Sequence, residues 1–171
     1  MISSVWREVP SKKRFKAFAL WIPILFIAYS ILPFSYEMLN QIPGHLIESK
    51  GILSVKKIGK NVYTTISDGQ STQVLTCASS FSGYTECLPH KIRPTVINKE
   101  AKALWYEQKV LPFATSNRLV ELYVDGKAVI TWEMSKERMA RSKKTSIYLY
   151  FGGMILIMSI SAFFMKKARE S

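Results

Sequence analysis

The sequence predicts an integral membrane protein of the α+β class, with two transmembrane helices flanking a small extracytoplasmic β-rich domain. Residues 17–36 and 146–165 contain no charged side chain. A helix of about 20 residues rises about 30 Å, which is the thickness of the hydrocarbon layer of a bilayer. Between these runs the pattern changes to short alternating segments separated by Gly and Pro, which is typical of antiparallel strands.

These patterns divide the chain into six parts. They are a basic cytoplasmic tail (1–16), transmembrane helix 1 (17–36), an extracytoplasmic β-rich domain (37–134), a basic stalk helix (135–145), transmembrane helix 2 (146–165) and a cytoplasmic tail (166–171). We expect Pro33 to bend or end the first helix, and Ser135 to cap a single long helix that extends transmembrane helix 2 as a stalk. Gly152 and Ser159 share one face of that helix and are candidates for helix packing.

Basic residues flank both spans, and we expect them to contact the anionic headgroups of the bilayer. They are Lys12, Lys13, Arg14 and Lys16 before the first span, Arg141, Lys143 and Lys144 before the second, and Lys166 and Lys167 after it. The net charge of +12 has no accompanying nucleic-acid motif, so we expect no nucleic-acid partner.

The orientation follows from the first span, which usually dominates topology. We expect a multi-pass protein of the cell inner membrane with both termini cytoplasmic and the central domain periplasmic. The basic residues before the second span favour the opposite orientation. The chain has no Asn-x-Ser/Thr sequon, which favours a bacterial inner membrane over a secretory-pathway membrane.

The central domain contains several predicted strands. They are residues 51–58, 61–67, 71–78, 118–124 and 127–132, with Asp125-Gly126 as a type I′ turn between the last two. Residues 99–108 fit either a short helix capped by Asn98 or an aromatic-rich strand, and the β surroundings favour the strand.

Strand alternation predicts which residues of 118–124 face the core. It places Leu119, Glu121 and Tyr123 on one face. Val120, Leu122 and Val124 form the other, uniformly apolar face, which we expect to be buried. Tyr123 and Glu121 are then exposed together, and they are the candidate partner-binding residues because tyrosine is enriched among interface anchors.

Both cysteines, Cys77 and Cys87, fall in the central domain. In an oxidising compartment we expect them to form a disulfide. Two unrelated buried thiols are an alternative. A zinc site that adds His45 and His90 matches none of the usual spacings, so no metal or other cofactor is expected.

The sequence contains no nucleophile elbow, phosphate-binding glycine loop or dinucleotide fingerprint. By elimination we expect a non-enzymatic, membrane-anchored protein-interaction protein. An accessory subunit of a membrane complex or an immunity-type protector against a toxin would fit, with another membrane or periplasmic protein as partner. The alternative is an oligomeric pore or small-solute transporter, which would require a homo-oligomer, and a third possibility is a membrane-tethered hydrolase.

Overall fold

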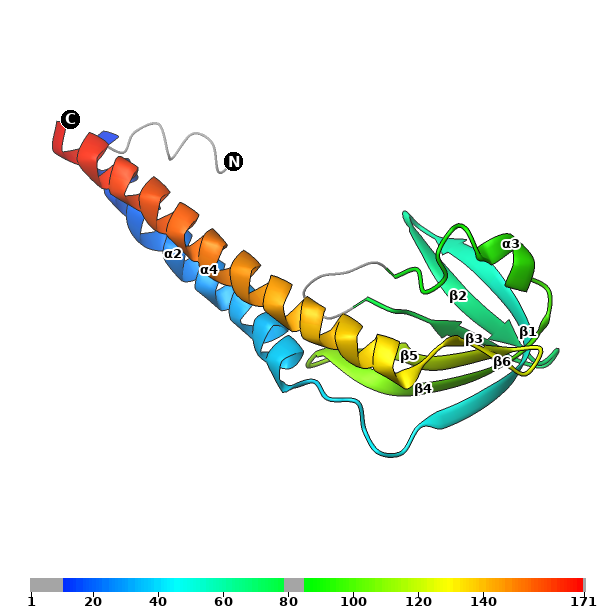
Figure 1. The fold of residues 1–171 in the computed structure, drawn as a ribbon. Helices are drawn as coiled ribbons and strands as arrows, with labels where there is room; N and C mark the ends of the chain where they lie inside the picture. The colour runs from blue at the N-terminus through cyan, green and yellow to red at the C-terminus, as the bar shows by residue number, and fades with distance from the viewer. Residues whose placement is uncertain (1–10, 79–84, 171) are drawn as a thin grey trace. The chain divides into compact units, whose positions relative to one another are not determined.

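The computed structural model describes residues 11–78 and 85–170 (Figure 1). The helices are α2 (Ser11–Leu39), α3 (Arg93–Val96) and α4 (Trp132–Glu170). The strands are β1 (Ile47–Ile58), β2 (Asn61–Ser67), β3 (Thr72–Leu75), β4 (Glu100–Leu111), β5 (Ala114–Val124) and β6 (Lys127–Ile130). The predictions for the first ten residues of the tail and for the loop at 79–84 lie outside the described residues. The chain forms two compact units, a helical unit up to Phe34 and from Ile147 onward, and a sheet unit, Ser35–Ser146.

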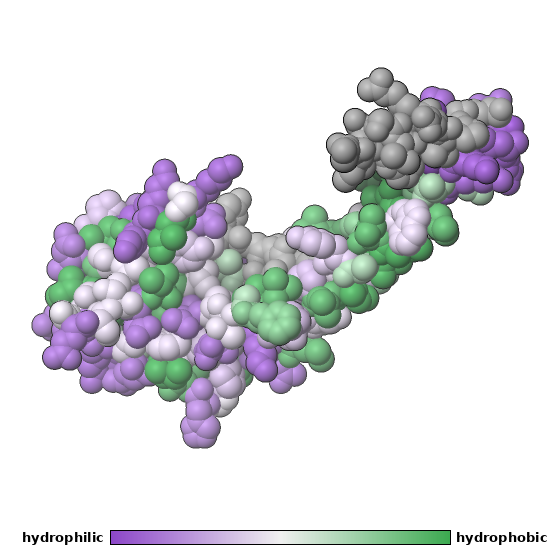
Figure 2. Space-filling model, turned by 180° about the vertical axis from the view of Figure 1, so that it is seen from behind, coloured by the Kyte–Doolittle hydropathy of each residue, from purple (hydrophilic) through white to green (hydrophobic). Residues whose placement is uncertain are grey.

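In the helical unit, α2 and α4 run antiparallel. The Phe15 and Phe164 rings lie 6.1 Å apart, and Phe34 stacks on Tyr150 with ring centroids 4.3 Å apart. By length and composition both helices can cross a membrane. On the face drawn in Figure 2, hydrophobic side chains cover the middle of the helices. The exposed apolar residues include Leu20, Leu25, Ile155, Leu156 and Phe163.

The structure revises two sequence expectations about these helices. α2 continues through Pro33 to Leu39, so Pro33 does not end the helix, because a proline removes one amide donor without necessarily ending a helix. Gly152 is exposed, and it is Gly153 that contacts α2: a Cβ there would lie 2.8 Å from the Phe26 ring. Likewise Ser159 is exposed while Ser161 is buried.

The sheet unit contains an antiparallel sheet with the strand order β3-β2-β1-β4-β5-β6. The predicted strand at 99–108 is confirmed as part of β4, and the Asp125-Gly126 turn has the positive φ angles of a type I′ turn. Thr76, just after β3, forms a parallel bridge with Arg118 of β5, so the sheet curves round on itself. The main core fills the inner face, with Leu53, Ile66 and Leu122 among its most buried members.

β5 does not alternate as predicted, because it carries a β-bulge. Leu104 pairs with Glu121 and Trp105 pairs with Leu119, so Val120 has no partner on β4. The extra residue shifts the alternation by one position. Leu119 is therefore buried in the main core with Leu122, and its predicted exposure is wrong. Val120 is also buried, but on the opposite face, where it packs with Tyr106 and Met139.

The start of α4 also differs from the prediction. The helix begins at Trp132, and the Thr131 hydroxyl accepts a hydrogen bond from the Met134 amide at 3.3 Å. Ser135, predicted as the cap, lies inside the helix and donates to the Val120 carbonyl oxygen at 2.5 Å. The Ser135 hydroxyl therefore satisfies a carbonyl oxygen of the sheet, and the Thr131 side chain caps the N-terminus of the helix.

Cys77 and Cys87 lie at disulfide-bonding positions, with their Cα atoms 5.1 Å apart. Both are buried in the main core. The covalent link constrains the unfolded chain, and it holds the segment before α3 against β3. A disulfide at this place is compatible with an oxidising compartment.

We expect Gly51→Ala to destabilise the sheet unit by about 3 kcal/mol or more, because the new Cβ would overlap the Ser67 carbonyl and the backbone there has a φ of +155°. Thermal unfolding of the full chain in detergent, followed by near-UV circular dichroism, measures the effect. Gly44→Ala is the matched control, because no atom lies within 4 Å of its added Cβ. Equal stability of the two variants would contradict the close approach of β2 to Gly51.

Candidate interaction surface

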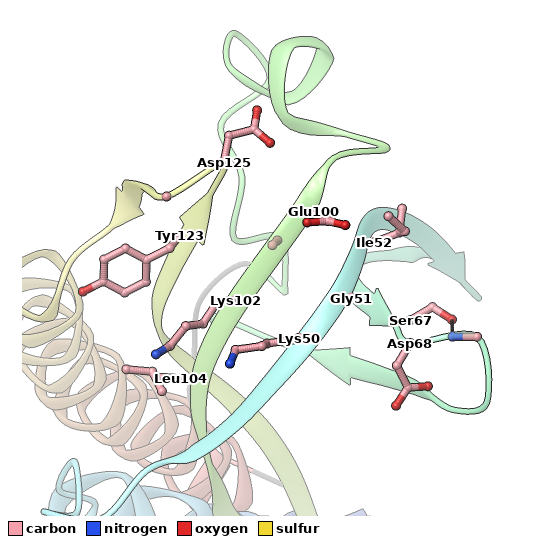
Figure 3. A pocket seen from close by; sticks show the side chains of 13 residues that line it. Lys50, Gly51, Ile52, Ser67, Asp68, Glu100, Lys102, Leu104, Tyr123 and Asp125 are labelled. Atoms are coloured by element: carbon pink, nitrogen blue, oxygen red, sulfur yellow. Dashed lines mark hydrogen bonds between the residues drawn. The ribbon is translucent and has the colours of Figure 1, made fainter.

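The sheet face opposite the main core is covered at one end by Met139 of α4, which packs on Tyr106 and Val120. The rest of that face is left open, and we call it the outer face. It consists of the side chains of β1, β4 and β5 that alternate with the core residues. Register aligns them in rows across the strands: Lys50 with Lys102 and Tyr123, and Glu48 with Leu104 and Glu121. A further pair, Ile52 and Glu100, lies beyond the lysine row. Figure 3 shows Lys50, Lys102 and Tyr123 side by side on their three strands.

Three of the charged side chains on this face form a linked pair of salt bridges. The carboxylate of Glu48 lies 3.0 Å from the Lys50 ammonium and 2.8 Å from that of Lys102. The hydrogen bond from Lys102, followed by that from Lys50, lowers the pKa of Glu48. One carboxylate thus holds two lysines over the middle of the sheet.

Tyr123 and Glu121, the two residues predicted to bind a partner, lie together on the outer face. The Tyr123 hydroxyl donates to a carboxylate oxygen of Glu121 at 3.0 Å. This hydrogen bond to a negative acceptor raises the pKa of Tyr123, because ionising the phenol would place two negative charges together. The ring is held half-buried at the edge of the outer face. The binding role of both residues stays a prediction.

A shallow hollow of about 990 Å³ lies on the outer face. Its apolar lining includes Ile52, Leu104 and the Tyr123 ring. Its charged lining is of both signs, with the basic residues Lys50 and Lys102 and the acidic residues Asp68, Glu100 and Asp125. Ile52 is 44% exposed, so part of this apolar surface is open to solvent. Gly51 and the β2–β3 turn form the far side of the hollow. No local sequence pattern predicts this hollow, because it combines residues from β1, β2, β4 and β5.

A cluster of buried polar side chains lies where β4 and β5 meet the ends of the long helices, and no sequence motif predicts it. Arg118 is 4% exposed and donates to the Gln108 side-chain oxygen at 3.0 Å. Burial raises the pKa of Tyr106 most strongly, while the nearby positive charge of Arg118 opposes that rise. Glu37, fully buried, also acts on Tyr106, and Arg138 lies within electrostatic reach of Arg118.

The predicted membrane-flanking basic residues have separate surroundings. Lys143 donates to the Met38 carbonyl oxygen at 2.8 Å and so satisfies an acceptor at the end of α2. The ammonium of Lys167 lies 5.7 Å from the ring centres of both Phe15 and Phe163. Most of the others are exposed, namely Lys12, Lys13, Lys16, Arg141, Lys144 and Lys166, whereas Arg14 is half-buried.

The residues considered for a zinc site do not come together. Cys77 and Cys87 pair with each other, and His45 and His90 are both exposed. Among residues 11–78 and 85–170, no group of three or more His, Cys, Asp or Glu side chains is arranged to hold a metal ion.

Comparison with protein families, curated proteins and solved structures finds no significant match to this chain.

We expect the Glu48 carboxyl to titrate below its ordinary range, and Lys102→Met to raise its pKa more than Lys50→Met does. The small stabilisation from these ion pairs is present above the ordinary carboxyl pKa and is lost as the pH falls through the lowered pKa of the folded chain. NMR titration of side-chain-labelled glutamate in the full chain measures both effects. An unchanged Glu48 pKa in the Lys102→Met variant would contradict the pairing.

Proposed function

We propose that this chain is a membrane-anchored, non-enzymatic interaction protein whose β-rich domain binds another membrane or periplasmic protein. An accessory subunit of a membrane complex, or an immunity-type protector that neutralises a toxin at the membrane, has this organisation. In this proposal the two long helices anchor the chain in the inner membrane with both termini in the cytoplasm.

The exposure of large apolar side chains along both helices supports the membrane anchor. Leu20 and Leu156 are each more than 60% exposed, and a helix pair in water would hide such residues. Polar residues at the helix ends have the opposite character, since Lys12 and Lys166 are exposed and basic. An apolar middle with basic ends matches a hydrocarbon layer bounded by anionic headgroups.

The outer face carries the interaction proposal. It joins an exposed apolar patch to charged side chains, three of which (Glu48, Lys50 and Lys102) are ion-paired, and this is the composition of an interface centre with a polar rim. The Tyr123 ring supplies a large amphipathic contact, and its bond to Glu121 fixes its orientation before any partner arrives.

We expect Tyr123→Ala to leave the domain folded and to weaken partner binding at least tenfold, because it removes an anchor but no core residue. A photo-crosslinking amino acid in place of Tyr123 in intact cells should capture one partner, whose affinity for the purified variants is then measured in detergent. Lys60→Ala, at an exposed turn remote from the outer face, is the control that should bind like the original chain.

Leu122→Asp, at a fully buried position, should instead unfold the domain. If Tyr123→Ala unfolds the domain as readily, the outward assignment of this residue is wrong. If it folds and binds with unchanged affinity, the outer face is not the interface.

We expect a reporter that works only in the cytoplasm to be active when fused after Ser171 and inactive when inserted between Ser82 and Gly83. The basic residues before the first span are the physical reason, because they favour retention on the cytoplasmic side. Measurement of reporter activity against matched expression levels decides the topology. The reverse pattern would place the domain in the cytoplasm and contradict a periplasmic partner.

A further inference from the structure

β1 changes its pairing partner halfway along its length. Residues Ile47–Ile52 pair with β4, whereas Ile52–Ile58 pair with β2. β2 ends at Ser67, opposite Ile52, so the first half of β1 has no strand on its other side. The outer hollow borders this half-strand at Lys50 and Gly51.

The backbone polar groups of Glu48 and Lys50 face the unoccupied side. The amide and carbonyl of Leu53 bond to Lys99 and Asn98 at the β4 edge. Successive residues in a strand direct these groups to alternate sides. Odd-numbered residues of β1 therefore bond toward β4, and Lys50 and Glu48 direct their amide and carbonyl groups away from β4, past the end of β2.

Hollows flank this edge on both faces of the sheet. On one side is the hollow of the outer face, with Ile52 and Leu104. On the other is a smaller hollow of about 460 Å³, whose lining includes the core-facing side chains of Ser49 and Ile66 and also Asp68 of the β2–β3 turn, which borders both hollows. Figure 3 shows Asp68 at the turn beside the point where β1 and β2 separate.

We propose that the free edge of β1 at Glu48–Lys50 is a site of strand addition, which takes an extended segment of a partner protein. The inference rests on the proposed interaction function and names the recognition mode. Added strands gain affinity from main-chain hydrogen bonds and specificity from alternate side chains. Here one side chain of the segment enters the outer hollow and the next enters the smaller one.

The lining of the two hollows defines the chemistry of the segment. The outer hollow offers the apolar surfaces of Ile52 and Leu104 and takes an apolar side chain. In the smaller hollow, the Asp68 carboxylate is fixed by the amides of Gln70 and Ser71 at 2.9 and 2.7 Å. It stays ionised there, so the second side chain is basic or a hydrogen-bond donor.

The charged residues of β1 do not block this edge. Lysines and glutamates often protect exposed strand edges from pairing. Side chains of a strand stand perpendicular to the sheet, however, and both Lys50 and Glu48 are drawn over the outer face, where they pair with each other. Their backbone groups remain accessible along the strand edge.

The test uses the full chain in lipid nanodiscs and a phage-displayed library of eight-residue peptides, with empty nanodiscs for counter-selection. We expect enriched peptides to alternate apolar with basic or polar residues. Their binding should slow hydrogen exchange of the Glu48 and Lys50 amides by at least tenfold, with little change at odd-numbered positions of β1.

Three variants separate the backbone from the side chain. Lys50→Pro removes the amide at the free edge and should weaken peptide binding at least tenfold. Lys50→Ala keeps that amide and should change binding less than threefold. Lys57→Pro is the matched control, because its amide points away from β2 in the other half of β1, and it should bind like the original chain.

Enriched peptides that bind the Lys50→Pro variant normally, or that protect other amides, overturn the proposal, and so does a library that yields no alternating ligand. If Lys50→Pro does not fold, the test is hydrogen exchange in the original chain: bound peptide must slow exchange of the Glu48 and Lys50 amides, and unchanged exchange there overturns the proposal. The peptide experiment does not use the natural partner, so its failure leaves the crosslinking result at Tyr123 standing. Failure of that crosslinking likewise leaves the edge measurement standing.

Discussion

The hydrogen bond between Ser135 and the Val120 carbonyl joins the sheet to the first turn of α4, and much of the sheet unit depends on it. The β-bulge removes Val120 from the ladder with β4, which leaves a buried carbonyl that would cost about 1–3 kcal/mol if unsatisfied. The Ser135 hydroxyl satisfies it. One turn further along, Met139 then packs on Val120 and Tyr106. Because of the extra residue in the bulge, Leu119 packs in the main core on one face of the sheet and Val120 packs against α4 on the other.

The buried polar cluster follows from the same arrangement. Arg118 lies two residues before Val120 and opposite Thr76, whose backbone bonds to Asn117 and Leu119 on either side of Arg118. The Arg118 side chain donates to Gln108. A guanidinium removed from water is stable only when its donors are satisfied, so the orientation of Gln108 matters as much as the charge. Glu37, at the end of α2, brings a negative charge into the same region. Within the sheet unit, the ends of both long helices therefore meet the sheet through specific polar contacts as well as apolar packing.

Local patterns predicted much of this fold. Alternation and the Asp125-Gly126 turn identified β5 and β6, and the two apolar runs identified the long helices. Non-local pairing explains what the patterns missed. β1 begins at Ile47, four residues before the predicted strand, because its first half pairs with β4. Tyr123 was correctly expected on the outer face, but Leu119 was misassigned, since a one-residue bulge reverses the alternation on one side of it only. No periodicity in the chain predicts the hollows, which are built from residues far apart in sequence.

The constraint at Gly51 connects the core to the open edge. Because no Cβ is present there, the Ser67 carbonyl approaches the β1 backbone closely, and β2 can end against β1 instead of continuing beside it. A larger residue would push the two strands apart, and the separation point would no longer be fixed. The edge at Glu48–Lys50 therefore has a defined shape before any partner binds, with the Glu48 carboxylate already paired with Lys50 and Lys102. Such preorganisation lowers the entropy cost of association, so a short edge with two free backbone positions can contribute to recognition.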